Sequence, residues 1–209
     1  MSVDPYCYPG TAVLRNKFDI RNEEELKSTE ARVAAFALFV LADEPLREPI
    51  DENRLLATHR AIFEEIYDWA GTYRKGVGTM TKGREVGYEY QVTYGNSQFV
   101  PGEMRRVFSE LEAEDFLRGL DSERFASRLA YFYSEIDSTH PFREGNSRTL
   151  RQFSADLALA AGYELDWEPT GRTAESRNAL YIARDYAFTQ KKYERLIAII
   201  RPILTPLQP

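Results

Sequence analysis

The chain has 209 residues, of which 43% are hydrophobic and 29% are charged. This composition is ordinary for a globular protein and excludes disorder over most of the length. The net charge of −6 argues against a broad nucleic-acid-binding surface, although a small basic pocket stays compatible with it. Cys7 is the single cysteine, so the chain can form neither an internal disulfide nor a cysteine zinc cluster.

The N-terminal sequence, MSVDPYCYPG, has neither the basic run nor the apolar core of a signal peptide. The most apolar segment, Val33 to Ala42, is too short to cross a bilayer. We therefore expect a cytoplasmic protein without membrane contact, to which a specialised secretion route is still open. A single domain is expected over residues 1–200, followed by a proline-containing tail at residues 201–209.

Helical spacing of apolar residues predicts two helices near the N-terminus. The first covers Glu23 to Leu41, and Asn22 can cap its start. Its expected inner face is formed by Leu26, Glu30, Val33, Phe36, Ala37 and Val40. The second helix is expected from about Asp51 to Trp69, with Gly71 ending it.

Residues 72–101 have a different pattern, rich in Gly, Thr, Tyr and Val and without an amphipathic helical stripe. We expect a short β-hairpin or flap there. Further helices are predicted at residues 104–112, 122–136, 146–161, 174–188 and 192–200. The prolines at 202, 206 and 209 are expected to end regular structure. The predicted fold class is mainly α with one strand-rich interruption.

The segment from His140 to Arg151, HPFREGNSRTLR, is the most informative for chemistry. The residue before a proline is pushed out of helical geometry, so His140 should lie at a helix exit. Gly145 supplies a turn, and the next helix should begin near Asn146. Because the first turn of a helix has unpaired N–H groups, the backbone of Gly145, Asn146 and Ser147 could hold phosphate oxygens.

The charged side chains of this segment fit a polyphosphate. Arg148 and Arg151 are three residues apart and would share one helix face. Glu144 would repel phosphates unless a hard cation lay between them, so it predicts Mg²⁺. His140 could take a proton from an incoming hydroxyl.

Each of these residues also has a structural explanation. A lone histidine after an apolar helix is more often a core residue whose hydrogen bonds are satisfied. Paired arginines usually form a solvated face, and Gly-Asn is usually only a turn. Their joint occurrence at one helix start is what favours a nucleotide site.

The segment resembles the Fic signature, HPFx(D/E)GNGRxxR, at every specified position but one. The resemblance extends over nearly the whole chain, through YPGTAVLRNK, IYDWAG, AGYELDW and YIARDYAFTQKKYERL. It implies the Fic fold, a helical bundle with a β-hairpin flap over the active site. It also implies a protein adenylyltransferase, which transfers AMP from ATP to a side-chain hydroxyl of a target protein.

The resemblance assigns a role to each residue of the motif. His140 would be the general base, and Glu144 would bind the Mg²⁺ that bridges the α- and β-phosphates. Asn146 and the neighbouring N–H groups would hold the α-phosphate. Arg148 would contact the β-phosphate and Arg151 the γ-phosphate.

Outside the motif, the resemblance implies that residues 72–94 form a flap that pairs with an extended target segment. Thr81 and Lys82 are the expected contacts in this flap, although an exposed turn explains these two residues equally well. Tyr181 would line the adenine side, although a tyrosine at helical spacing is more often part of the core.

Ser147 is the one departure, because the Fic signature has glycine there and glycine suits a close approach of backbone to ligand. Serine is favourable at a helix start, so we expect it to be tolerated. Doc-type relatives have lysine at this position and phosphorylate their targets. Transfer of another phosphate-containing group, or a catalytically weak module that binds nucleotide or a partner, are therefore the alternatives.

Many Fic proteins are restrained by a helix with the sequence (S/T)xxxE(G/N), whose glutamate pairs with the second motif arginine. Neither end of this chain contains it. The resemblance to FicT-type toxins then implies a separate small antitoxin whose glutamate would engage Arg151. DNA gyrase and topoisomerase IV are the expected targets, and no direct binding to nucleic acid is expected.

Overall fold

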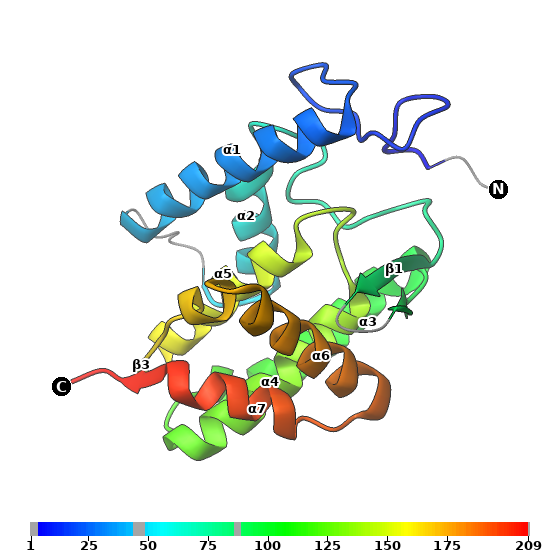
Figure 1. Ribbon diagram of the computed structural model, residues 1–209. Helices are drawn as coiled ribbons and strands as arrows, with labels where there is room; N and C mark the ends of the chain where they lie inside the picture. Colours follow the sequence, from blue (N-terminus) through cyan, green and yellow to red (C-terminus); the bar gives the residue numbers. More distant parts are fainter. Residues whose placement is uncertain (1–3, 44–48, 86–88, 209) are drawn as a thin grey trace.

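The computed structural model describes residues 4–43, 49–85 and 89–208, and Figure 1 shows a mainly helical chain. The α-helices are α1 (Glu23–Asp43), α2 (Glu52–Phe63), α3 (Val100–Ala113), α4 (Ser122–Thr139), α5 (Asn146–Ala160), α6 (Ala174–Gln190) and α7 (Glu194–Ile200). Short 3-10 turns are η1 (Ser97–Phe99), η2 (Asp115–Leu117), η3 (Glu168–Gly171) and η4 (Arg201–Ile203). The predicted fold class is confirmed.

Two antiparallel strand pairs accompany the helices. The predicted flap is the hairpin of β1 (Met80–Glu85) and β2 (Glu89–Tyr94). The second pair joins β3 (Tyr163–Leu165) to β4 (Leu204–Pro206). The expectation that the C-terminal prolines end regular structure was therefore wrong. Proline is tolerated at a sheet edge, and Pro206 lies at the last position of its strand, opposite Tyr163.

The second helix is shorter than predicted, since it ends at Phe63 instead of Trp69. Its continuation is replaced by turns, with the N–H of Ala70 donating to the carbonyl of Tyr67 at 3.2 Å. The carbonyl of Ile66 accepts from the N–H of Lys17 at 2.8 Å, a bond to the N-terminal segment that competes with helix continuation. Tertiary contacts thus override the helical spacing.

Helix α5 lies between two parts of the core. In Figure 1, α1 and α2 lie on one side of α5, and α4, α6 and α7 lie on the other. The larger cluster centres on α4, whose apolar face is buried: Phe125, Leu129, Phe132, Tyr133 and Ile136. The smaller cluster joins α1 and α2 through Leu26, Ala34, Ile62 and Phe63. The motif helix is therefore held from both sides.

Helix α1 buries a narrower face than its sequence suggested. Asn22 caps its start as predicted, with its side chain accepting from the N–H of Glu25 at 2.9 Å. Phe36, expected on the inner face, is 69% exposed, and Phe39 is 73% exposed. The helix packs mainly against α2, so only one narrow stripe of it is covered. No helix in the described ranges combines the length and apolar character that a membrane crossing needs.

Candidate active site

His140 lies directly after α4, in the position expected from Pro141. It adopts a left-handed backbone conformation with φ of 49° and ψ of 63°. Its N–H donates to the carbonyls of Ile136 and Asp137 at 3.2 and 3.1 Å, which closes the helix end. The imidazole stacks on the ring of Tyr94, with centroids 3.9 Å apart. The hairpin and the end of α4 thus meet at this side chain.

The turn between His140 and α5 is fixed by Phe142, Gly145 and Asn146. Phe142 is 1% exposed and anchors the turn in the core. The Asn146 side chain accepts from the N–H of Phe142 at 2.9 Å and donates to its carbonyl at 2.8 Å. Both polar atoms of the Asn146 side chain are thus bonded to the backbone of Phe142. Asn146 would therefore contact a phosphate through its backbone N–H.

A pocket of about 290 Å³ opens at the start of α5. Its lining residues are Lys82, Tyr94, His140, Glu144, Gly145, Asn146, Ser147, Arg148, Arg151, Tyr181 and Arg184. The structure thus brings together every predicted site residue except Thr81. Thr81 is exposed, and its hydroxyl lies 3.1 Å from that of Thr93 on β2. Successive strand residues face opposite sides, which explains why Lys82 lines the pocket and Thr81 does not.

Glu144 is the acidic group of this pocket. Burial raises its pKa, but Lys82, the N–H of Gly145 and Arg148 lower it, and the net effect holds the pKa below its usual value. The Gly145 N–H donates to the carboxylate at 2.8 Å. Among the residues that the structure describes, no three acidic, histidine or cysteine side chains converge. Glu144 is therefore ionised at neutral pH, and it is the one acidic side chain among the residues that line this pocket.

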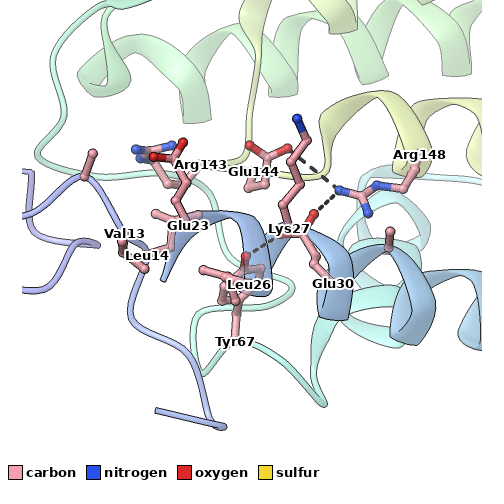
Figure 2. Close-up of a pocket in the computed structure, with 12 residues that line it drawn as sticks. Val13, Leu14, Glu23, Leu26, Lys27, Glu30, Tyr67, Arg143, Glu144 and Arg148 are labelled. Atoms are coloured by element: carbon pink, nitrogen blue, oxygen red, sulfur yellow. Dashed lines mark hydrogen bonds and ion pairs between the residues drawn. The ribbon is translucent and has the colours of Figure 1, made fainter. Parts of the chain in front are cut away.

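Arg148 is held from the α1 side by a residue that sequence reasoning missed. Its guanidinium donates to Glu30, which also accepts from the hydroxyl of Tyr67. Figure 2 shows Glu30 between these two groups, beside a second pocket of about 490 Å³ that shares Glu144 and Arg148 with the first. The guanidinium also lies 4.7 Å from the ring centroid of Phe63. The sequence feature that could have indicated this role is that Glu30 is an acidic residue within the otherwise apolar stripe of its helix.

Arg184 is a further basic residue that the sequence analysis did not select. It is 3% exposed and pairs with Asp137 through two hydrogen bonds, one of them 3.0 Å long. Burial lowers its pKa, but the Asp137 carboxylate outweighs burial and raises it. Its remaining terminal nitrogen donates to the hydroxyl of Ser147 at 3.2 Å. Arg184 lies three residues after Tyr181, so both side chains share one helix face. This spacing could have indicated that Arg184 lines the same pocket as Tyr181.

Replacing Ser147 with glycine should leave the nucleotide transfer that the resemblance implies within about tenfold of the original rate, because Arg184 keeps its pair with Asp137. The same change should lower the free energy of unfolding by at most about 1 kcal/mol, since glycine is less favourable than serine in the first turn of a helix. Urea unfolding and labelled-ATP assays measure the two effects. A change in the transferred group would contradict the expectation that serine is tolerated here.

His59 supports the motif from α2. Its Nδ1 accepts from the N–H of Gly71 at 2.8 Å, so its Nε2 carries the proton and donates to the carbonyl of Glu144 at 3.1 Å. The ring stacks on Phe142, with centroids 3.8 Å apart. Burial lowers the pKa of His59 to about 3. The His59 side chain is therefore neutral, and its hydrogen bond holds the backbone of Glu144 in place.

This shift in pKa predicts acid sensitivity. The contribution of a neutral His59 to stability is complete above pH 6.5 and is lost as the pH falls toward about 3. One proton gives a slope of at most about 1.4 kcal/mol per pH unit. Urea unfolding between pH 7.5 and 5.0 should show a steeper loss for the original protein than for a His59→Asn variant. Equal slopes would contradict this origin of the acid sensitivity.

His140, Glu144 and the two arginines at the start of α5 thus line one pocket beside the hairpin. Residues 49–158 match the Fic/DOC family. The chain therefore belongs to this family.

Several relatives are similar to this chain over most of its length. The "Probable protein adenylyltransferase y4lH" of Sinorhizobium fredii is 37% identical over 169 residues, which are 78% of this chain and 79% of that protein. The "Protein adenylyltransferase VbhT" of Bartonella schoenbuchensis is 32% identical over 179 residues. The match covers 86% of this chain and 36% of VbhT, so the chain spans about a third of that relative's length.

Solved structures show the same fold. The N-terminal Fic domain of a VirB-translocated Bep effector protein from Bartonella quintana, solved with bound ADP, is 27% identical with a TM-score of 0.82. That alignment covers 97% of this chain and 95% of the other. The Fic domain of Bep8 from Bartonella sp. 1-1C also gives a TM-score of 0.82 at 26% identity, covering 99% of this chain and 97% of that one. The predicted Fic fold is confirmed.

Proposed function

We propose that the chain is a protein adenylyltransferase that transfers AMP from ATP to a side-chain hydroxyl of a target protein. The main support is that His140, Glu144 and the start of α5 line one pocket beside the β1–β2 hairpin. Relatives named protein adenylyltransferase or probable protein adenylyltransferase are 32–37% identical over most of the chain, which supports a nucleotidyl-transferring enzyme.

In the proposed reaction, His140 takes the proton of the target hydroxyl while its oxygen attacks the α-phosphorus. The new bond joins that oxygen to phosphorus, and the bond to the bridging oxygen of the β-phosphate breaks, so that pyrophosphate leaves. The backbone N–H groups at the start of α5 stabilise the charge on the α-phosphate oxygens. Arg148 and Arg151 neutralise the departing phosphates.

The residues present also fit a magnesium ion. Glu144 is ionised and lines the pocket, and one carboxylate together with substrate phosphates is a common way to bind Mg²⁺ in proteins. Glu144 would hold the ion, with phosphate oxygens as further ligands. Bound there, Mg²⁺ would neutralise charge on the phosphates. The hydrogen bonds from Gly145 to the carboxylate and from His59 to the backbone carbonyl keep Glu144 in place.

The hairpin fits a role in target binding. Within the described residues, β1 and β2 pair only with each other, so each strand has an outer edge without a strand partner to which an extended target segment could pair. Lys82 lines the pocket from β1, and Tyr94 from β2 contacts His140. A segment added to the hairpin would therefore place its side chain near the imidazole.

Labelled ATP tests the reaction. With magnesium and a bacterial lysate, ATP labelled at the α-phosphate should transfer label to protein, while ATP labelled at the γ-phosphate should not. Label from the γ-position alone would instead show the kinase alternative that Ser147 keeps open. Binding of ATP without transfer from either position would indicate a module that only binds nucleotide.

We also propose that this enzyme is a cytoplasmic toxin restrained by a separate small antitoxin. Arg148 and Arg151 line a wide groove of about 1030 Å³ between α1 and α5, whose apolar walls include Phe39 and Trp167. An amphipathic helix with a glutamate directed at Arg151 would fit the apolar walls and the basic end. DNA gyrase and topoisomerase IV are the proposed targets, on the resemblance to FicT-type toxins.

The restraint and the targets can be tested together. The isolated chain should transfer labelled AMP to subunits of gyrase or topoisomerase IV. Co-expression with the product of the neighbouring gene should suppress the transfer, and Phe39→Glu should relieve that suppression without changing the rate of the isolated chain. The opposite outcome is that the isolated chain transfers AMP slowly and becomes faster when α1 is changed, for example by Glu30→Gln. That result would show that the restraint lies within the chain and not in a separate antitoxin.

A further inference from the structure

Arg74 is a fully buried cation whose role the pocket does not reveal. It lies between α2 and the hairpin and is 1% exposed. Its backbone N–H donates to the carbonyl of Pro141 at 2.8 Å. Burial, together with the positive charge of Arg143, lowers the pKa of the guanidinium. Arginine keeps its charge in such places, so a buried cation here must be compensated by the groups around it.

The guanidinium of Arg74 donates to backbone carbonyls on three stretches of the chain. Its Nε donates to the carbonyl of His140 at 2.6 Å, and one terminal nitrogen donates to that of Thr139 at 3.3 Å. The terminal nitrogens also donate to the carbonyls of Gly78, at 2.9 Å, and Gly95. Gly78 precedes β1 and Gly95 follows β2, so one planar group joins both ends of the hairpin to the turn of the histidine.

The hydrogen bonds from Arg74 stabilise an unfavourable backbone conformation at His140. His140 adopts the left-handed conformation, which residues other than glycine rarely adopt. At the end of β2, Tyr94 stacks on the His140 imidazole. Ser97 closes the base of the hairpin by donating its N–H to the Gly78 carbonyl at 2.9 Å. The hairpin base and the histidine turn are therefore connected twice, through the ring contact and through Arg74.

We propose that Arg74 is a positioning residue that fixes the distance and orientation between the hairpin, which presents the target hydroxyl, and the imidazole, which takes its proton. This inference rests on the proposed function of the hairpin and His140. Arginine suits the task because its fork of donors is rigid, whereas lysine offers a single point charge on a flexible stem. A misplacement of about 1 Å between reacting groups can cost about 100-fold in rate.

The first test needs no catalytic activity. In the original protein, the amides of Arg74 and Ser97 should exchange hydrogen for deuterium at rates within about tenfold of each other, because both belong to one cooperatively opening unit. In Arg74→Lys, the protected amides of residues 80–85 and 89–94 should exchange at least about tenfold faster. Independent opening in the original protein, or unchanged hairpin exchange in the variant, would overturn the proposal.

The second test separates positioning from general stability. Arg74→Lys should reduce AMP transfer to lysate proteins by about 100-fold while the Kd for Mg·ATP, measured by calorimetry, stays within about threefold. Arg54→Lys is the matched control, because Arg54 is also buried but pairs with Asp156 at 3.0 Å, between α2 and α5. It should leave hairpin exchange unchanged. Equal losses of rate in both variants, or parallel losses of rate and ATP affinity, would indicate a merely structural role.

The outcomes distinguish this inference from the proposed function. If the original protein transfers no AMP, the proposed function fails, and the exchange measurements still decide whether Arg74 couples the hairpin to the histidine turn. If transfer occurs and Arg74→Lys keeps the original rate, the proposed function holds and the positioning role of Arg74 is rejected.

Discussion

A His140→Ala variant should transfer AMP about 10² to 10⁴ times more slowly than the original protein, which is the usual contribution of a general base. The Kd for Mg·ATP should change little, because the phosphates are expected to contact the start of α5 and its arginines. The left-handed backbone of His140 and the stacking on Tyr94 fix the position of the imidazole. The substitution therefore removes a base that is already oriented in the pocket.

Initial rates with α-labelled ATP measure this effect, and calorimetry measures the affinity for ATP. Ser127→Ala is a suitable control, because Ser127 lies on α4, the helix that ends just before His140, and its hydroxyl donates within that helix to the carbonyl of Glu123 at 2.9 Å. A His140→Ala rate within tenfold of the control would reject His140 as the base and would require another proton acceptor in the pocket.

Gly145→Ala is expected to have the largest effect on stability. Gly145 has a φ of 80°, and an added Cβ would lie 2.2 Å from Cε2 of Phe63, which is fully buried. Overpacking costs about 1–3 kcal/mol, and the left-handed conformation adds about 1–2 kcal/mol for a residue with a Cβ. The turn before α5 must then shift, so both the free energy of unfolding and AMP transfer should fall.

Urea unfolding can separate the two costs. Gly119→Ala is the matched control, because its φ of 73° is similar but an added Cβ would meet nothing within 4 Å. It should lose only the backbone contribution of about 1–2 kcal/mol. Combining Gly145→Ala with Phe63→Leu should recover part of the remaining loss, as measured by a double-mutant cycle. Additive losses in the double variant would show that the clash is not the cause.

The parts of the site that lie close together in the sequence were predictable. Local rules were sufficient for the exit of His140 before Pro141, the turn at Gly145 and the helix from Asn146. The resemblance added the roles of these residues, and the pocket contains nearly all of them. A motif that folds on itself needs no knowledge of distant contacts.

Residues that support the motif from elsewhere were not predictable by these rules. His59 and Arg74 contact the motif through backbone carbonyls, and hydrogen bonds to a backbone leave no pattern in the sequence. The end of α2 at Phe63 was missed because a bond from Lys17 determines the path of the chain there. The exposure of Phe36 was missed because periodicity shows that a helix has an apolar face but not how much of it a neighbour covers.

The pair formed by Glu30 and Arg148 indicates how much of the chain an active fragment must contain. The family match begins at residue 49, yet Glu30 lies on α1, and Tyr181 and Arg184 lie beyond residue 158. A fragment limited to residues 49–158 would contain the whole motif but would lack the carboxylate that holds Arg148 and one wall of the nucleotide pocket. It would also uncover Ile62 and Phe63. Because Leu196 and Ile200 of α7 are also fully buried in the larger core cluster, the smallest active piece of this chain should extend from before α1 through α7.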